Sequence, residues 1–190
     1  MKIGLFFGSF NPIHNGHLII ATYMLENSDL EQVWMVLSPQ NPFKQNNTLL
    51  NEYHRLYLVQ LAIEGEHHIK AVDIEFSLPK PSYTINTLAY LEEKYPAHEF
   101  SIIMGSDSLQ NLKKWKSGDL IQKRYPIYVY NRPGFEADDS LKEAKIIRTK
   151  APLLEISSSM LRKMIKEKKS IRYYVPDTVF QELKKAGYYK

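Results

Sequence analysis

The sequence contains no cysteine and no long apolar run. Without cysteine, the chain has no disulfide, no thiol nucleophile and no cysteine-ligated zinc, which suits a reducing compartment. No apolar stretch approaches the roughly 18 residues that a membrane span needs. The opening residues, MKIGLFFGSF, lack a small-residue cleavage pattern, so we expect a first strand there and not a signal peptide. These features favour a cytoplasmic location and no membrane partner.

The length and composition indicate one folded domain over residues 1–190. A single core serves chains of up to about 250 residues. Hydrophobic residues make up 44% and charged residues 24%, which supplies enough apolar material for a core. The sequence shows no internal repeat, low-complexity tract or linker. It leaves the oligomeric state open, a homo-oligomer included.

The positive charge is concentrated near the end of the chain. The net charge is +4, but residues 162–190 hold nine Lys or Arg and three Asp or Glu, so the rest carries −2. A basic end is one mark of nucleic-acid binding. The interleaved aromatic and basic residues of single-strand binders are missing. We therefore favour a solvated helical face with a few phosphate-binding cations, and no nucleic-acid partner.

Short apolar runs alternate with helical patterns along the chain. The runs resemble strands that are covered on both faces. They are Ile3–Phe7, Val33–Leu37, Ile69–Ile74, Phe100–Met104 and Ile127–Tyr130. The helical patterns between them are Gly16–Glu26, Tyr53–Glu64 and Thr84–Lys94. This alternation predicts an α/β, doubly wound parallel sheet of about five strands with helices on both faces.

Two further helices are expected after the last strand, as a C-terminal helical extension. Hydroxyls at Ser157–Ser159 can cap the start of the first. The second runs from about Asp177 to Ala186 and ends at Gly187, a residue suited to a C-terminal cap. The polar segments Ser38–Asn51 and Asn131–Ala144 are predicted to be loops that can carry function.

The segment after the first strand, GSFNPIHNGH, combines several features of an anion site. Gly8 lets a ligand approach the backbone closely, and the following helix start offers unpaired amides and a positive dipole end. His14 and His17 are three residues apart, so both can face one pocket and donate to phosphate oxygens. A metal pair is an alternative, but no third ligand of obvious spacing follows. A turn with two incidental histidines is the plainer alternative.

Two later segments could complete such a site. Gly105 and Asp107 follow the fourth apolar run, and Asp107 could accept hydrogen bonds from ribose hydroxyls or simply cap a helix. If strands one and four are neighbours, this turn meets the first where the winding reverses. The second segment is a serine-rich helix start from Ile156, where Arg162 can hold phosphate. Taken alone, it could be an ordinary capped helix.

These segments carry a family resemblance that covers essentially the whole chain. GSFNPIHNGH and SSSMLR resemble the two signatures of the nucleotidyltransferase superfamily. The resemblance implies a Rossmann-like core, attack on the α-phosphate of ATP, release of pyrophosphate, and Mg²⁺ carried with ATP. It implies phosphate contacts from His14, His17 and Arg162. It also implies a nucleotide-binding set of Gly8, Ser9, Phe10, Gly105, Asp107, Ile156, Ser157 and Ser158. Phe7 stands where many relatives have glycine.

Within the superfamily, the chain resembles bacterial nicotinate-nucleotide adenylyltransferases. The matching stretches are NPFK, SYTINTL, GSD, LKKW and RPG. The resemblance implies that Lys44 meets phosphates and that Thr84, Trp115 and Arg132 bind the acceptor. An exposed aromatic face such as Trp115 could stack on a pyridine ring, although a core position is the plainer alternative. Phe43 departs from the common histidine of the first stretch.

The resemblance therefore implies transfer of AMP from ATP to nicotinate mononucleotide, a step in NAD biosynthesis. Two alternatives remain at this stage. Pantetheine-phosphate adenylyltransferases share both signatures but lack the SYTINTL and LKKW matches. A nucleotide-binding sensor without catalysis would also bind ATP, although the intact His14, His17 and Arg162 disfavour it. The preference between nicotinate and nicotinamide mononucleotide is not set by the sequence.

Overall fold

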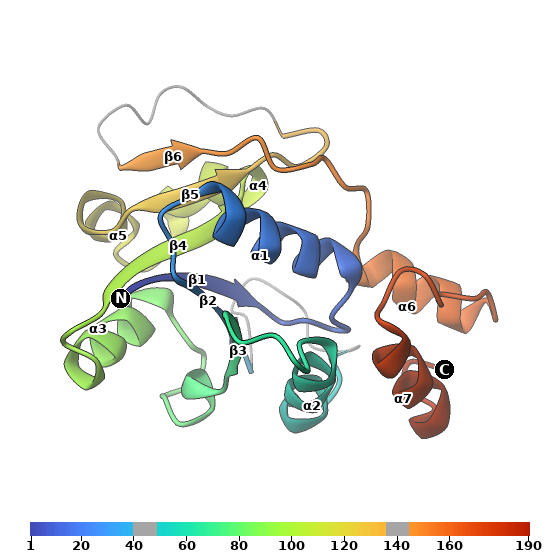
Figure 1. Cartoon of the computed structure of the whole chain (residues 1–190). Helices are drawn as coiled ribbons and strands as arrows, with labels where there is room; N and C mark the ends of the chain where they lie inside the picture. Colours follow the sequence, from blue (N-terminus) through green and yellow to red (C-terminus); the bar gives the residue numbers. More distant parts are fainter. Residues whose placement is uncertain (40–48, 136–144) are drawn as a thin grey trace.

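A computed structural model describes residues 1–39, 49–135 and 145–190. Its centre is a parallel sheet with the strand order β3-β2-β1-β4-β5-β6 (Figure 1). The strands are β1 (Lys2–Gly8), β2 (Gln32–Leu37), β3 (Ile69–Val72), β4 (Glu99–Gly105), β5 (Ile127–Tyr130) and β6 (Ile146–Arg148). The five predicted strands are confirmed. The sixth, β6, is a correction to the expected count: it spans three residues at the sheet edge and has no buried apolar run.

Successive strand side chains enter two separate cores, one on each face of the sheet. In β2, Val33, Met35 and Leu37 belong to the first core. Trp34 and Val36, between them, belong to the second. Because side chains alternate along a strand, near-continuous apolar runs mean that both faces are covered. The predicted doubly wound architecture is confirmed.

Helices cover both faces. The first core receives α1 (Asn15–Asn27), α2 (Glu52–Ala62), α6 (Ser158–Lys166) and α7 (Asp177–Ala186). The second receives α3 (Thr84–Lys94), α4 (Ser106–Gln110) and α5 (Gly118–Arg124). Two single 3₁₀ turns, Ile74–Phe76 and Leu112–Lys114, complete the described elements. The short helices α4 and α5 were not predicted, because five and seven residues carry too little periodicity.

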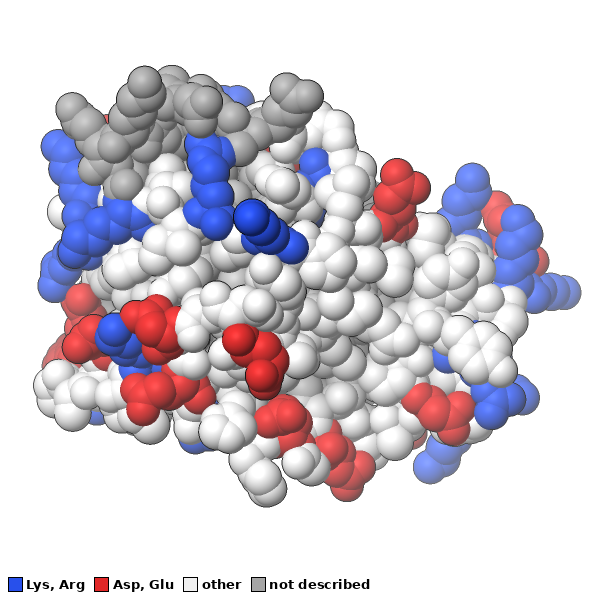
Figure 2. All heavy atoms as spheres, turned by 45° about the horizontal axis from the view of Figure 1, so that its top comes forward, with Lys and Arg blue, Asp and Glu red and all other residues white. Residues whose placement is uncertain are grey.

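Both C-terminal helices begin at the predicted residues, and α7 also ends where the sequence predicted. Ser157 caps α6, and its hydroxyl oxygen accepts a hydrogen bond from the backbone N–H of Met160 at 3.2 Å. Gly187 ends α7 in the left-handed region with φ 68°. Lys and Arg side chains gather at the end of the molecule that α6 and α7 form (Figure 2). No helix of the described chain is long and apolar enough to cross a membrane.

The winding of the sheet reverses at β1. From β1 the chain proceeds to β2 and β3, then crosses back through α3 to β4 on the other side of β1. The carboxyl ends of β1 and β4 therefore lie side by side. Such a reversal is where open α/β sheets bind their ligands. Gly8 and Gly105 are the last residues of these two strands, as the sequence predicted.

Candidate active site

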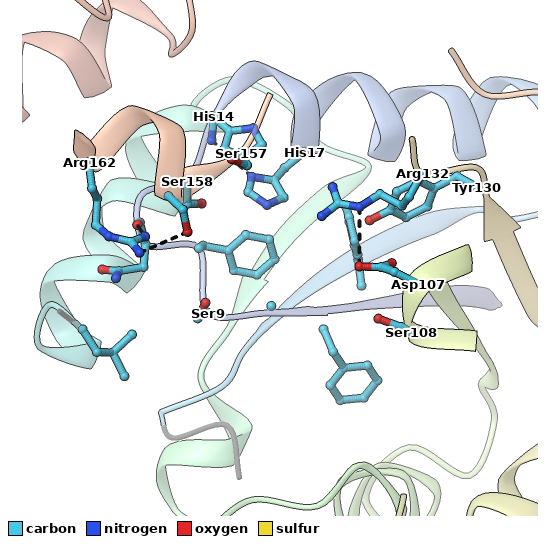
Figure 3. A pocket seen from close by; sticks show the side chains of 17 residues that line it. Ser9, His14, His17, Asp107, Ser108, Tyr130, Arg132, Ser157, Ser158 and Arg162 are labelled. Carbon is cyan, nitrogen blue, oxygen red and sulfur yellow. Dashed lines mark hydrogen bonds and ion pairs between the residues drawn. The ribbon is translucent and has the colours of Figure 1, made fainter. Parts of the chain in front are cut away.

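A cavity of about 280 Å³ opens at the carboxyl ends of β1 and β4 (Figure 3). Its walls come from the loop after β1, the start of α1, the start of α4, the end of β5 and the start of α6. The lining residues are Phe6, Phe7, Gly8, Ser9, Phe10, Asn11, His14, His17, Leu49, Asp107, Ser108, Tyr130, Arg132, Ser157, Ser158, Ser159 and Arg162. Segments more than 140 residues apart in the sequence thus share one wall.

The loop between β1 and α1 is held in an unusual conformation by packing. Phe10 has φ 42°, which is uncommon for a bulky residue. Its ring is 1% exposed and lies against Gly8. A Cβ atom at Gly8 would come within 2.8 Å of that ring. Gly8 therefore admits the ring of Phe10, in addition to the close ligand approach that the sequence suggested.

His14 and His17 face each other at the start of α1. Their rings stack with centroids 3.7 Å apart, and the ring of Phe10 meets His17 edge-on at 5.0 Å. The backbone N–H of His14 donates to Nδ1 of His17 at 3.3 Å. An accepting Nδ1 places the proton of a neutral imidazole on Nε2, which makes His17 a hydrogen-bond donor. Both histidines line the cavity, as predicted.

His14 is buried and is kept neutral by its surroundings. Burial, and to a smaller extent the positive charge of Arg132, lower the pKa of His14 to about 4. Its Nδ1 atom has no hydrogen-bond partner within the described residues. The absence of a side chain at Gly16 makes space for this ring, because a Cβ atom at Gly16 would lie 3.0 Å from Nδ1 of His14. In the free protein, His14 contributes a neutral imidazole and not a cation.

The start of α6 is fastened to the loop after β1. The hydroxyl of Ser158 donates to the carbonyl oxygen of Pro12 at 2.9 Å. The Arg162 guanidinium donates to the carbonyl oxygen of Asn11 at 2.7 Å and to the hydroxyl of Ser159 at 3.2 Å. Figure 3 shows Arg162 and Ser158 on one side of the histidines. Hydroxyls, helix-start amides and a guanidinium together form a seat for phosphate.

The opposite wall carries an ion pair. Nε of Arg132 lies 3.6 Å from Oδ2 of Asp107 (Figure 3), and the backbone N–H of Arg132 donates to the hydroxyl of Ser106 at 2.9 Å. A Cβ at Gly105 would overlap both charged side chains. The N-cap of α4 is Gly105, so Asp107 lies in the first turn and is not the cap. The alternative reading of Asp107 as a helix cap was therefore wrong.

Most predicted site residues converge on this one cavity. Those that line it are Gly8, Ser9, Phe10, His14, His17, Asp107, Arg132, Ser157, Ser158 and Arg162. Gly105 and Ile156 stand directly behind the wall. Arg132, assigned to the acceptor from the resemblance, shares this cavity with the nucleotide set. Lys44 lies outside the described residues.

The two other acceptor residues, Thr84 and Trp115, do not line this cavity. Thr84 is the first residue of α3, and Trp115 follows the 3₁₀ turn Leu112–Lys114. Nζ of Lys116 lies 4.7 Å from the ring centroid of Tyr83, so these two segments are in contact. Trp115 is half-buried and packs against the second core. It is therefore partly a core residue, with a remaining exposed part.

Sequence reasoning missed several residues that shape the site. Tyr130 and Leu49 line the cavity, and Arg55 and Tyr189 bind the loop that forms it. One signal was available for Arg55, which lies four residues before buried Val59 on the core side of α2. A charged residue at a buried helix position requires hydrogen-bond partners, so its presence predicts a buried hydrogen-bond network around it. Tyr130 was recognised only as the last residue of a predicted strand, and no pattern marks Leu49 or Tyr189 as site residues.

Carboxylates are scarce around the cavity. Asp107 is the one carboxylate residue among the described residues that line it. The described part of the chain also holds no group of three His, Asp or Glu residues close enough to share a metal ion. The donor set here suits phosphate oxygens.

Comparison with known proteins assigns the chain to a family. The cytidylyltransferase-like family model matches residues 5–164. Proteins named "Probable nicotinate-nucleotide adenylyltransferase" are 52% identical in Flavobacterium psychrophilum, over the full length of both chains, and 51% identical in Cytophaga hutchinsonii, over 100% of this chain and 98% of that one. The chain belongs to the nicotinate-nucleotide adenylyltransferase family.

A solved structure shares the fold of this family member. The Plasmodium falciparum nicotinic acid mononucleotide adenylyltransferase complexed with NaAD superposes with a TM-score of 0.86, at 23% identity over 99% of this chain and 97% of that one. The Rossmann-like core implied by the sequence is confirmed. The family assignment also decides between the two superfamily members considered above, against pantetheine-phosphate adenylyltransferase.

Proposed function

We infer that this chain transfers AMP from ATP to nicotinate mononucleotide, forming nicotinate adenine dinucleotide and pyrophosphate. The observation that carries this function is one cavity in which the His14–His17 pair faces Arg162 and the serine-rich start of α6. The cavity lies where the winding reverses, in a chain about half identical to nicotinate-nucleotide adenylyltransferases over its whole length.

The reaction requires no covalent intermediate on the enzyme. A phosphate oxygen of the acceptor attacks the α-phosphorus of ATP, and the bond from that phosphorus to the pyrophosphate oxygen breaks. The attacking oxygen is already anionic, so no general base is needed. Catalysis then consists of positioning the two phosphates and stabilising the charge that develops on their oxygens.

The described residues divide this work between them. The Nε2 proton of His17 is a preorganised donor toward an oxygen of the α-phosphate. Arg162 already donates to Asn11 and Ser159 in this structure, which fixes its guanidinium at the edge of the phosphate seat. Asp107 accepts from ribose hydroxyls and Arg132 faces the phosphates. Lys44 is proposed to meet the phosphates too.

We propose that Mg²⁺ enters with ATP. The cavity offers donors for phosphate and a single carboxylate residue among its described lining residues, which fits an ion held mainly by phosphate oxygens. When bound, the ion would neutralise charge on the triphosphate. His14, His17 and Arg162 would bind phosphate oxygens beside it. We also propose a cytoplasmic location, which the use of ATP as substrate and a sequence without cysteine support.

The acceptor is proposed to occupy the region between the cavity and the start of α3. The exposed part of Trp115 offers a face for the pyridine ring, and the hydroxyl and amide of Thr84 offer donors for its carboxylate. Contact between Lys116 and Tyr83 keeps these two segments together. Arg132 stands on the cavity side, where the acceptor phosphate must meet ATP.

The direct test is identification of the product. The purified chain is incubated with ATP, Mg²⁺ and nicotinate mononucleotide, and the mixture is separated by chromatography. Nicotinate adenine dinucleotide should form together with an equal amount of pyrophosphate, and the His17→Ala variant should form far less. ATP binding without any dinucleotide would replace this function with that of a nucleotide sensor.

A further inference from the structure

The C-terminal tail turns back from α7 into the active-site loop. After α7 the backbone is left-handed at Gly187 (φ 68°) and at Tyr189 (φ 65°). A left-handed conformation is unfavourable for tyrosine and persists only where surrounding contacts hold it. One such contact is made by its hydroxyl, which donates to Oδ1 of Asn11 at 2.7 Å.

Asn11 is the point where three segments meet the loop that lines the cavity. Its Oδ1 accepts from the Tyr189 hydroxyl and from the backbone N–H of Leu50 at 3.1 Å. Its carbonyl oxygen accepts from Arg162 at 2.7 Å. Asn11 is 4% exposed, so a lost partner is not replaced by bulk water. If Asn11 were displaced, its carbonyl oxygen would move, and this oxygen orients the guanidinium of Arg162.

Arg55 holds the same loop from the side of α2. It is fully buried, and its guanidinium donates to four carbonyl oxygens of the described residues, those of Ser9, Ser38, Pro39 and Leu50. Within the described residues it forms no ion pair. Burial raises the pKa of Tyr189, and the charges of Arg55 and Arg162 oppose that rise. The hydroxyl therefore stays protonated and able to donate at neutral pH.

We propose that Tyr189 is a positioning residue for adenylyl transfer: its hydroxyl fixes Asn11 and the Ser9–His14 loop, so the C-terminal tail completes the active site. This role rests on the proposed function of the cavity. Helix α7 delivers the tail, since Thr178 at its start donates to the carbonyl oxygen of Leu61 in α2 at 3.1 Å. The segment from α7 to the C-terminal tail is thus held at Thr178 by α2 and at Tyr189 by Asn11.

The chain offers a matched control in the preceding residue. Tyr188 is also half-buried, and its ring stacks on His54 with centroids 5.2 Å apart. Its hydroxyl makes no hydrogen bond to the described residues. Tyr188→Phe and Tyr189→Phe each remove one hydroxyl from adjacent rings. Only the second removes a contact with the active-site loop.

The test compares steady-state kinetics of these variants, below the unfolding transition of each. Tyr189→Phe should lower kcat/KM for ATP about tenfold, because the loop that binds ATP is no longer held in position by the Tyr189 hydroxyl. The same variant should leave KM for nicotinate mononucleotide within about twofold of the wild type. Tyr188→Phe should match the wild type. Equal kinetics in the two variants, or equal losses for both substrates, would overturn the proposal.

A double-mutant cycle with Asn11→Ala separates positioning from general stability. If Tyr189 acts through Asn11, its substitution should have no further effect on kcat/KM once Asn11 is alanine. Additive losses in the double variant would contradict the mechanism. A wild-type chain without adenylyltransferase activity would reject the proposed function instead, whereas an active wild type with an unaffected Tyr189→Phe variant would reject only the role of the tail.

Discussion

The backbone N–H of His14 donates to Nδ1 of His17 while the two rings stack 3.7 Å apart. This relationship explains why the histidines are three residues apart at a helix start. The first residue caps the helix and the second turns back to accept from it. With Nδ1 as the acceptor, the proton of a neutral His17 imidazole is on Nε2, in a residue that lines the cavity.

His17→Ala should therefore lower kcat by about two to four powers of ten, the range expected for losing one preorganised donor to a transition-state oxygen. His67→Ala provides the control, because His67 is exposed and distant from the cavity. Turnover is measured as pyrophosphate release at saturating ATP and acceptor. Turnover close to wild type in His17→Ala would remove the role assigned to this residue.

The buried His14 should make the free protein sensitive to acid. Its pKa is lowered from 6.5 to about 4, so folding favours the neutral form. The stability from this site is fully present above about pH 6.5 and is lost as the pH falls toward 4. His14→Gln should flatten the pH dependence of the free energy of unfolding across that window, measured by urea denaturation. An unchanged slope in the variant would show that other groups cause the acid sensitivity.

ATP should raise the pKa of the same histidine. The phosphates bring negative charge to a ring whose pKa is otherwise lowered by burial and by Arg132. A proton NMR titration of His14 with and without Mg-ATP measures the shift. Arg132→Gln should raise the His14 pKa in the free protein as well. A pKa that is identical with and without nucleotide would place the phosphates away from His14.

Gly16→Ala should separate stability from activity. A Cβ at this position would lie 3.0 Å from Nδ1 and 3.1 Å from Cε1 of His14, so the ring must shift by a few tenths of an ångström. Alanine favours the helix by up to about 1 kcal/mol over glycine. We expect kcat to fall about tenfold while Tm stays within a few degrees of the wild type, measured by calorimetry. Full activity would show that the position of the His14 ring is not critical.

Trp115→Ala should affect the acceptor more than ATP. A stacked pyridine ring contributes about 0.5–1.5 kcal/mol, so KM for nicotinate mononucleotide should rise several-fold, up to about tenfold. KM for ATP should stay within about twofold. Tyr173→Ala, at a residue that is 86% exposed, controls for the loss of an aromatic ring. Equal increases in both KM values would assign Trp115 to the core and not to the acceptor site.

The sequence predicted the elements whose patterns are strong and local. Near-continuous apolar runs identified β1 to β5, and the glycines that end β1 and β4 located the cavity before the strand order was known. The strand β6 escaped because Ile147 is 42% exposed and its neighbours are not buried either. A three-residue edge strand buries too little surface to leave a period in the sequence.

Long-range contacts account for what the sequence did not reveal about the site. The hydrogen bond from Tyr189 to Asn11 joins residues that are 178 positions apart, and no pattern around Tyr189 indicates it. Short motifs drew attention to Arg132 and to Asp107 separately, but neither motif indicated that the two side chains form an ion pair. A motif can indicate that a residue belongs to a site. Its contact partner in the folded protein depends on the order in which the strands are arranged in the sheet.

The most direct test of the central claim is pyrophosphate release from Mg-ATP with nicotinate mononucleotide, nicotinamide mononucleotide and phosphopantetheine supplied in parallel. We predict fast release with nicotinate mononucleotide and no release with phosphopantetheine. Release with phosphopantetheine alone, or with none of the three, would contradict the assignment of this site to nicotinate mononucleotide.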